Sequence, residues 1–315
     1  MMETAHKEHI LDTRRIGSLQ ASVVGLGCNN FGWRMDYEAT AAVVHAALDS
    51  GITFFDTADI YGGTRSEEYL GRALGTRRND IVLATKFGMA VDEQRKGARP
   101  EYVHRAAEDS LTRLRTDYID LYQLHQPDPE VPIADTLGAL DRLVKAGKVK
   151  EIGCSNFSAE QLDEAERAIT PGAARFVSVQ NEYSLLKREP ERSVLPACER
   201  LGLAFLPYFP LASGLLTGKY EAGNVPKDSR LSLSWTSRFT TEKNVRIADA
   251  LKSFAAGRRH TLLELAISWL AARPRVASVI AGATSPDQIR ANVAAANWSL
   301  TPEELAEIDR LAPAT

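Results

Sequence analysis

The chain has 315 residues, with 38 Lys and Arg against 41 Asp and Glu, a formal charge of −3, and 44% hydrophobic residues. This composition is that of an ordinary folded protein and excludes a collagen, a disordered tail and a membrane protein. The near-neutral charge includes no long basic run that would favour nucleic acid or a membrane surface. We therefore expect a small-molecule partner. The length fits either two domains or one α/β barrel with additions.

The cysteines and the N-terminus indicate the compartment. Cys28, Cys154 and Cys198 are few, odd in number and in no CxxC spacing, so we expect reduced thiols without a disulfide framework or a bound metal. Residues 1–10 lack the apolar core of a signal peptide. The most apolar extended segment, 261–272, is short for a membrane span and contains Glu264. These features predict a cytoplasmic protein.

Short β-branched runs alternate with longer helix-period segments along the whole chain, as in a parallel sheet. Residues 11–16 and 18–23 flank Gly17 and predict a hairpin that closes a barrel floor. The barrel strands predicted after the hairpin are residues 22–27, 53–57, 81–87, 119–124, 149–154, 176–181, 204–208 and 277–281. Most of these strands are too continuously apolar to have a face in water.

The segments between these strands each carry one apolar stripe, which is typical of helices that cover a sheet. Two such stripes are Val103, Ala107, Leu111 and Leu114, and Ile133, Leu137, Leu140 and Val144. Helix starts are indicated by Asp36 and by two pairs of capping-box form, Ser158 with Gln161 and Thr301 with Glu304.

The order of elements favours a (β/α)8 TIM barrel with an N-terminal β-hairpin and a C-terminal extra helix at 302–311. We expect one domain over residues 1–315, with the barrel at about 22–298, because no linker or composition shift interrupts the chain. The stretch at about 210–240 is too long for an ordinary connection and is a candidate lid or binding loop.

Four polar residues stand where a barrel places its chemistry, at the carboxyl ends of strands. Asp56 ends the second strand, five residues before Tyr61, Lys86 ends the third strand and His125 follows the fourth. Each alone has a structural explanation, as an ion-pair partner, a rim aromatic, a strand-end lysine or a core histidine. Together they predict one site, because a buried charge needs a partner in the same mouth.

Such a set can exchange a proton with a carbonyl oxygen. A cation beside Tyr61 would stabilise its phenolate, and Lys86, held by Asp56, is the natural candidate. His125 would position and polarise the carbonyl. The set contains no obvious nucleophile–base pair, so a hydride or another electron source must come from elsewhere. A barrel lyase that uses Lys86 as a Schiff-base nucleophile is the alternative.

At these residues the sequence resembles the aldo-keto reductase superfamily, whose Asp–Tyr–Lys–His tetrad matches Asp56, Tyr61, Lys86 and His125. The matching motifs occur in order along nearly the whole chain. They are GLG at 25–27, FFDTADIYG at 54–62, GCSNFS at 153–158, VQNEYS at 179–184, PLASGLLTGKY at 210–220 and GATSPDQI at 282–289. The resemblance implies a nicotinamide cofactor across the barrel mouth, without a Rossmann fingerprint.

The resemblance also implies which residues hold the cofactor. Ser155, Asn156 and Gln180 would bind the carboxamide, and Tyr208 would stack on the nicotinamide ring. The pyrophosphate would lie against Leu211, Ser213, Gly214, Leu215, Gly218, Lys219 and Arg230, and the adenosine against Gly282, Thr284, Gln288 and Asn292. Some of these residues have simpler roles open to them: Ser155 and Asn156 at a helix start, Lys219 and Arg230 as solvated charges, and Gln288 as the capping partner of Ser285.

NADP(H) is the family default, but members that prefer it usually offer a Lys or Arg near the last motif. Here only Arg290 is close, so NAD(H) or dual use is the rival expectation. On the substrate side, an apolar or sugar-stacking pocket is predicted from Asn30, Phe31, Trp33, Trp235 and Phe239. A small aldehyde or ketone fits it, as does a sugar hemiacetal in the oxidative direction. Because the superfamily includes potassium-channel β subunits, a cofactor-binding regulatory subunit is a further alternative.

Overall fold

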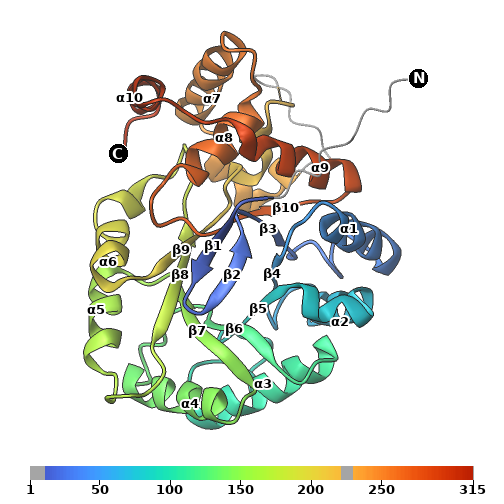
Figure 1. The fold of residues 1–315 in the computed structure, drawn as a ribbon, viewed down its shortest axis with the longest axis vertical. Helices are drawn as coiled ribbons and strands as arrows, with labels where there is room; N and C mark the ends of the chain where they lie inside the picture. Colours follow the sequence, from blue (N-terminus) through green and yellow to red (C-terminus); the bar gives the residue numbers. More distant parts are fainter. Residues whose placement is uncertain (1–10, 221–229, 315) are drawn as a thin grey trace.

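The computed structural model describes residues 11–220 and 230–314 (Figure 1). Within these residues, eight parallel strands pair in the order β10-β3-β4-β5-β6-β7-β8-β9. The two ends of this sheet meet where the Phe205 N–H donates to the Arg275 carbonyl at 2.7 Å and the Ala277 N–H to the Phe205 carbonyl at 3.0 Å. The predicted (β/α)8 barrel is therefore confirmed.

The strands lie close to their predicted positions. They are β3 Val24–Gly27, β4 Phe54–Asp56, β5 Val82–Phe87, β6 Ile119–Leu124, β7 Val149–Ser155, β8 Phe176–Glu182, β9 Ala204–Tyr208 and β10 Val279–Gly282. The last strand begins two residues later than predicted, because Ala277 takes part in the closure with β9. The predicted 22–27 strand starts at Val24, because Ser22 belongs to the hairpin.

Helices form a ring around the barrel strands (Figure 1). Those that follow barrel strands are α1 Tyr37–Asp49, α2 Arg65–Leu74, α3 Pro100–Leu114, α4 Ile133–Lys145, α5 Ala159–Arg167, α6 Val194–Leu201, α8 Leu262–Ala271 and α9 Pro286–Ala294. The predicted terminal helix is α10 Pro302–Leu311. It packs against α7 Glu242–Ala256, a helix that the strand–helix alternation did not predict (Figure 1).

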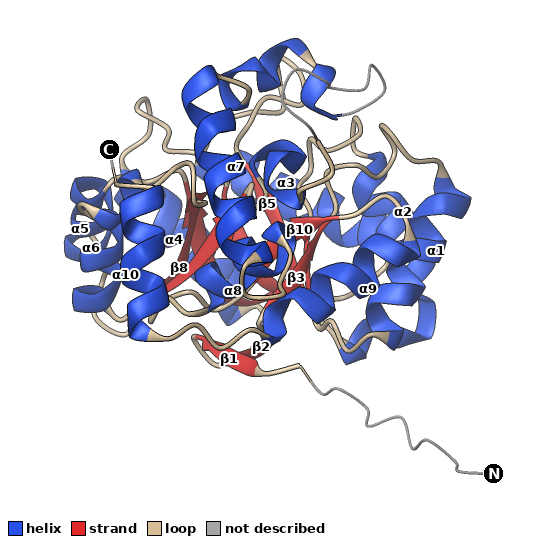
Figure 2. Cartoon of the chain, turned by 90° about the horizontal axis from the view of Figure 1, so that it is seen from above, coloured by secondary structure: helices blue, strands red, loops and turns tan. Residues whose placement is uncertain are grey.

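The barrel interior is filled from below by the predicted hairpin. Strands β1 Thr13–Ile16 and β2 Leu19–Ser22 pair antiparallel across one end of the barrel (Figure 2). Their side chains Ile16 and Leu19 form one buried cluster with inward-facing residues such as Phe54, Val82 and Leu121. The floor is therefore closed by apolar packing, which leaves the opposite, carboxyl end of the strands for the polar residues.

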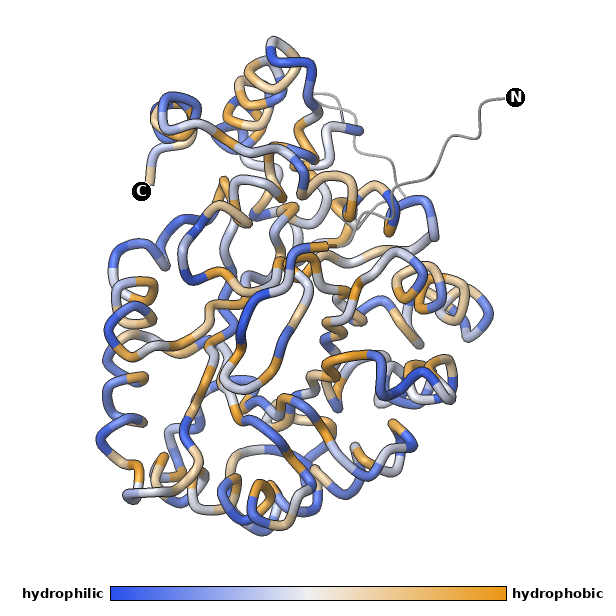
Figure 3. The backbone as a smooth tube through the Cα atoms, viewed as in Figure 1, coloured by the Kyte–Doolittle hydropathy of each residue, from blue (hydrophilic) through white to orange (hydrophobic). Residues whose placement is uncertain are grey.

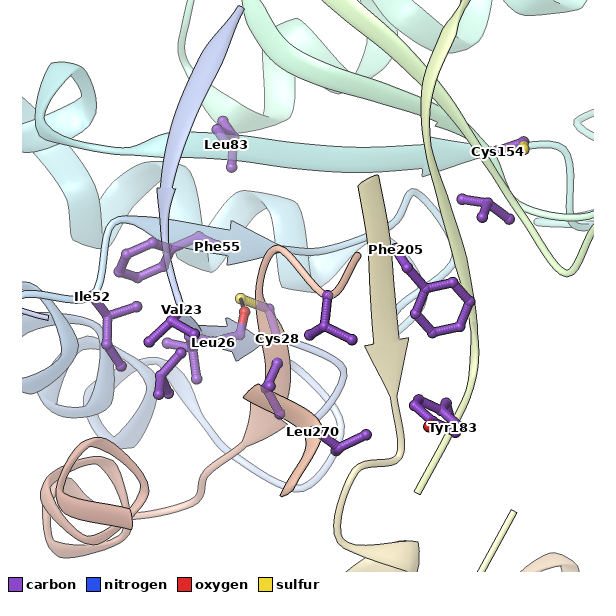
Figure 4. Close-up of a cluster of buried hydrophobic side chains, with 14 of the residues drawn as sticks. Val23, Leu26, Cys28, Ile52, Phe55, Leu83, Cys154, Tyr183, Phe205 and Leu270 are labelled. Atoms are coloured by element: carbon purple, nitrogen blue, oxygen red, sulfur yellow. Dashed lines mark hydrogen bonds between the residues drawn. The ribbon is translucent and has the colours of Figure 1, made fainter. Parts of the chain in front are cut away.

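A second apolar layer lies between the strands and the helices. Figure 4 shows members of this layer: Phe55 of β4 and Leu83 of β5 on neighbouring strands, Phe205 of β9 on the other side of the view, and Leu270 of α8. Along the outer helices, hydrophobic and hydrophilic residues alternate with the turns of the tube (Figure 3), as the predicted apolar stripes require. Asp36 caps α1, and the two predicted capping boxes begin α5 and α10.

The long stretch at 210–240 is built of short turns where the structure describes it: η3 Ala212–Thr217, η4 Arg230–Ser232 and η5 Ser234–Phe239. Residues 221–229 lie outside the described part.

The three cysteines all lie in the described part of the chain and are free and buried. Among the described helices, none has the length and apolar character needed to cross a bilayer.

Candidate active site

A cavity of about 1100 Å³ opens at the carboxyl ends of the barrel strands. It is slightly larger than a usual small-molecule pocket. Most residues predicted for the site line it. These are Asp56, Tyr61, His125, Ser155, Asn156, Gln180, Tyr208, Leu211, Ser213, Gly214, Lys219, Gly282, Thr284, Gln288, Asn292, Asn30 and Trp33.

The strand alternation places Lys86 inside the barrel. Along β5, Val82 and Ala84 belong to the interior cluster, so Lys86 is the next inward position. There its Nζ donates to Asp56 Oδ2 at 2.7 Å and to the Thr57 carbonyl at 2.8 Å. Lys86 is 0% and Asp56 3% exposed, so this is a buried ion pair at the floor of the cavity, where Asp56 is part of the lining.

Two amides hold the other oxygen of Asp56. Gln180 donates through Nε2 to Asp56 Oδ1 at 2.8 Å, and Gln123 donates to the same oxygen at 3.3 Å. Gln180 was predicted as a cofactor contact, and its carboxamide is thus oriented by Asp56. Gln123 was not predicted, although it lies on β6 between the inward-facing Leu121 and His125, the residue that follows the strand.

Tyr61 lies in the loop after β4, with its ring centroid 5.1 Å from Lys86 Nζ. Burial raises the pKa of Tyr61 above its ordinary value, and the Lys86 ammonium opposes this effect without cancelling it. The expected acidifying effect of the cation is therefore present but outweighed in the free protein.

Lys86 itself stays charged. Burial alone would lower its pKa, but Asp56 and Tyr61 outweigh burial and raise it. A Schiff-base nucleophile must be a neutral amine, so this environment disfavours the lyase alternative.

His125 faces Tyr61 from the end of β6, with the ring centroids 5.7 Å apart and the planes at 80°. Burial, and then the nearby Lys86 charge, lower the pKa of His125 to about 3. The imidazole is therefore neutral at physiological pH. Its buried Nδ1 has no hydrogen-bond partner among the described residues, so Nε2 is the nitrogen on the cavity side.

A chain of hydrogen bonds links Tyr208, Asn156 and His125 in the cavity wall. The Tyr208 hydroxyl donates to Asn156 Oδ1 at 2.8 Å, and Asn156 Nδ2 donates to the His125 carbonyl at 2.9 Å. Asn156 has a φ of +62°, a left-handed conformation that asparagine tolerates. Ser158 caps α5, so Ser155 and Asn156 do not serve as the helix cap. The Ser155 hydroxyl instead donates to the Gln180 carbonyl.

The turn at η3 forms the next part of the cavity wall. Ser213 and Gly214 have φ angles of +58° and +107°, which turn the backbone away from a helix. The buried Ser213 Oγ has no partner among the described residues. Leu215 does not line the cavity but is 7% exposed in the hydrophobic core, so its predicted cofactor contact finds no support. The side chain of Arg230 lies outside the described part.

Neutral side chains line the far end of the cavity, at the start of α9. Gln288 Oε1 accepts from the Thr284 N–H at 2.9 Å, and the Ser285 hydroxyl accepts from the Gln288 N–H at 3.4 Å. Gln288 therefore braces Thr284 instead of completing a capping box. Arg290 pairs with Asp287 and is not part of the cavity lining.

The substrate side was predicted less well. Asn30 and Trp33 line the cavity, and Trp33 is 50% exposed. The prediction for Phe31 is wrong, because Phe31 is 0% exposed in the core. Phe239 is likewise buried in the core at 4% exposure, and the Trp235 side chain lies outside the described part. Further lining residues that the sequence did not indicate include Met89, Gln126 and Phe209.

Comparison with known proteins agrees with this geometry. Residues 23–313 match the model of the aldo/keto reductase family. The "Probable aldo-keto reductase 1" of Glycine max is 36% identical over 305 residues, 93% of this chain and 86% of the relative. A protein of Oryza sativa subsp. japonica named "Probable voltage-gated potassium channel subunit beta" is 36% identical over 291 residues, 89% of each chain.

Among solved structures, a glycerol dehydrogenase from Gluconobacter oxydans superimposes with a TM-score of 0.83 at 34% identity. The match covers 95% of this chain and 94% of the dehydrogenase. Together with the family match, it supports an oxidoreductase. The chain belongs to the aldo-keto reductase family.

Proposed function

We propose that this chain is an NAD(P)(H)-dependent oxidoreductase that interconverts an aldehyde or ketone, or a sugar hemiacetal, with its alcohol or oxidised form. The observation that carries the proposal is the meeting of four side chains from three successive strands at the cavity floor. The buried Lys86–Asp56 pair, 2.7 Å apart, lies beside Tyr61, and the ring of the neutral His125 packs edge-on to the Tyr61 ring, with the centroids 5.7 Å apart.

The residues of the cavity fit a dinucleotide. At one end, Ser155, Asn156 and Gln180 offer amide and hydroxyl groups, which suit a carboxamide that both donates and accepts. Beside η3, the unpartnered Ser213 Oγ suits an anionic pyrophosphate. A buried hydroxyl without a partner is costly, and a bound phosphate oxygen would accept its hydrogen bond.

The protein's part of the reaction is the movement of a proton. A bound nicotinamide supplies or accepts the hydride. Tyr61 donates the proton to the carbonyl oxygen in reduction and takes it back in oxidation. Lys86 stabilises the phenolate that remains, Asp56 holds Lys86 in place, and His125 orients the carbonyl through Nε2.

For the nucleotide, we infer that NAD(H) binds at least as well as NADP(H). A 2′-phosphate gains most from a fixed cation. At the α9 end of the cavity the described lining residues are neutral, and Arg290, which pairs with Asp287 at the surface, is not among them. Of the described lining residues, Lys219 is the cation in the predicted pyrophosphate segment.

Turnover by the purified protein tests the proposal. Loss of reduced-nicotinamide absorbance is followed with small aldehydes and ketones, and its appearance with polyols and aldoses. Tyr61→Phe should lower kcat by at least ~100-fold while leaving nucleotide affinity unchanged, because it removes the proton donor and keeps the ring. Turnover by Tyr61→Phe at the wild-type rate would refute the assigned role.

A second candidate function rests on the names of two relatives. The rice protein and one from Arabidopsis thaliana, 35% identical over 311 residues, are both named "Probable voltage-gated potassium channel subunit beta". A regulatory subunit of that kind would bind nucleotide and form a stable complex with a membrane protein, with negligible turnover. Affinity capture with the wild-type chain, alongside the turnover panel, separates the two functions.

A further inference from the structure

Behind the inward face of β5, between the sheet and helices α2 and α3, lies a second group of buried polar side chains. Thr85, next to Lys86 on the strand, donates to Glu67 Oε1 at 2.6 Å. Arg113 of α3 donates to Glu67 Oε2 at 2.7 Å, so this carboxylate has its own cation. We name this group the outer acid cluster; its members are Asp59, Glu67, Thr85, Tyr102 and Arg113.

Asp59 is the acid of the cluster that has no cation of its own. It is 2% exposed, and its Oδ1 has no hydrogen-bond partner among the described residues. Its Oδ2 accepts a long hydrogen bond of 3.4 Å from the Tyr102 hydroxyl. The titratable side chains around it are Glu67 from α2, Tyr102 and Arg113 from α3, and Tyr122 from β6.

These surroundings favour the neutral carboxyl. Burial, and then the negative charge of Glu67, raise the pKa of Asp59 to about 7, while Arg113 and Tyr102 oppose the rise. Asp59 therefore exchanges its proton near neutral pH, where the buried carboxylate would have no compensating charge of its own.

The loop that carries Asp59 also carries Tyr61, and it contacts Lys86 at two points. The Thr57 carbonyl accepts from Lys86 Nζ at 2.8 Å, and the Asp59 N–H donates to the Lys86 carbonyl at 3.1 Å. The Tyr61 N–H in turn donates to the Ala58 carbonyl at 3.2 Å. The loop segment that carries Asp59 and Tyr61 is thus hydrogen-bonded to β5 at Lys86.

We propose that Asp59 is a positioning residue that holds the Tyr61 loop in register with Lys86. The inference rests on the proposed function, in which Tyr61 exchanges the proton. The neutral carboxyl fits the buried site between the loop and the helices. The carboxylate is repelled by Glu67 and loosens the loop, so Tyr61 moves relative to Lys86.

This role predicts a pH dependence that Tyr61, Lys86 and His125 do not produce. The pKa of His125 is about 3, and the pKa values of Tyr61 and Lys86 are raised from ordinary values that already lie well above neutrality. A fall of kcat as the pH rises through about 7 is therefore not expected from Tyr61, Lys86 or His125, whereas Asp59 titrates there.

The first test is the pH profile of kcat. The wild type should lose at least about threefold between pH ~6 and ~8.5, with a midpoint near 7. Asp59→Asn keeps the shape and stays neutral, so its profile should be flat across this range. Tyr102→Phe removes a hydrogen bond that lowers the pKa of Asp59 and should move the midpoint to higher pH.

A matched control is Asp120→Asn. Asp120 is a buried carboxylate near the other end of β6, paired with Arg78 and Lys150. Its loss should lower stability but leave the midpoint of the pH profile in place. A shift of the midpoint in Asp120→Asn equal to that in Tyr102→Phe would overturn the proposal.

The second test needs no substrate. The chain is labelled with tyrosine enriched in ¹³C at Cζ, and the Tyr61 resonance is assigned as the one missing from Tyr61→Phe. The wild-type resonance should shift with a midpoint near pH 7, and the shift should vanish in Asp59→Asn.

If that coupling is present but no carbonyl or alcohol turns over, the proposed function fails and the positioning role stands. A Tyr61 resonance that does not move near neutral pH in the wild type, or that moves equally in Asp59→Asn, overturns the positioning role. Should Asp59→Asn not fold, an unshifted midpoint in Tyr102→Phe overturns it as well.

Discussion

Replacing Lys86 with methionine keeps an unbranched side chain, one heavy atom shorter, and removes its charge. Asp56, 3% exposed, would lose the cation at 2.7 Å and keep the amide donors of Gln180 and Gln123. Removing one partner of a buried ion pair typically costs ~3–5 kcal/mol. Because the two amides still solvate the carboxylate, we expect the lower end of this range, a loss of about 3 kcal/mol in the free energy of unfolding.

The double variant Asp56→Asn with Lys86→Met separates stability from chemistry. It leaves no buried charge at the pair, so it should be more stable than Lys86→Met alone by about 2 kcal/mol. Its activity should stay as low as that of Lys86→Met, because the phenolate of Tyr61 still lacks a neighbouring cation. The two variants thus move together in kcat and apart in stability.

Urea unfolding at neutral pH, followed by circular dichroism, measures the stabilities, and equal m values show that the folded and unfolded states are comparable. The control is Lys145→Met on α4, whose ion pair with Asp141 lies at the surface and should contribute under ~1 kcal/mol. A loss below about 1 kcal/mol in Lys86→Met, or a double variant less stable than Lys86→Met, would refute the reasoning about the buried pair.

Three further predictions follow from other parts of the site. Ser213→Ala should weaken nucleotide binding by about three- to tenfold, because the hydroxyl is unpartnered until a ligand accepts its hydrogen bond. The melting temperature of the free protein should stay unchanged or rise. Equal nucleotide affinity of variant and wild type in calorimetry would contradict this. Gln288→Arg should shift the NADPH-to-NADH affinity ratio toward NADPH by about tenfold, by placing a cation at the α9 end; an unchanged ratio would mean that the 2′-phosphate lies elsewhere. The pKa of His125, about 3, lies below that of a histidine in the unfolded chain, so the free energy of unfolding should fall as the pH drops from about 6.5 towards 3. Acid unfolding should show that His125→Gln loses less stability over that range.

The sequence predicted the elements wherever periodicity is strict. Along β5 the alternation of Val82, Ala84 and Lys86 decides which side chains enter the barrel, and α10 begins and ends where its cap and stripe indicate. Helix α7 was missed because it stands outside the strand–helix alternation that organised the prediction.

The site was predictable in its residues more than in its contacts. The bond between Gln180 and Asp56 joins residues 124 positions apart, and no local pattern reports it. The raised pKa of Tyr61 depends on a burial that only the closed barrel creates. Phe31 and Trp33 are both aromatic residues in the loop after β3, and packing alone sends Phe31 into the core and Trp33 to the cavity.

The central claim is that the cavity holds a nicotinamide dinucleotide against Tyr61. It is tested most directly by titrating the wild-type protein with NADH and NADPH separately at one fixed salt concentration, following the tryptophan fluorescence to which Trp33 at the cavity contributes. The account predicts saturable quenching by both nucleotides, with NADPH binding no tighter than NADH because the described lining at the α9 end of the cavity is neutral. Absence of any saturable binding by either nucleotide would contradict the account.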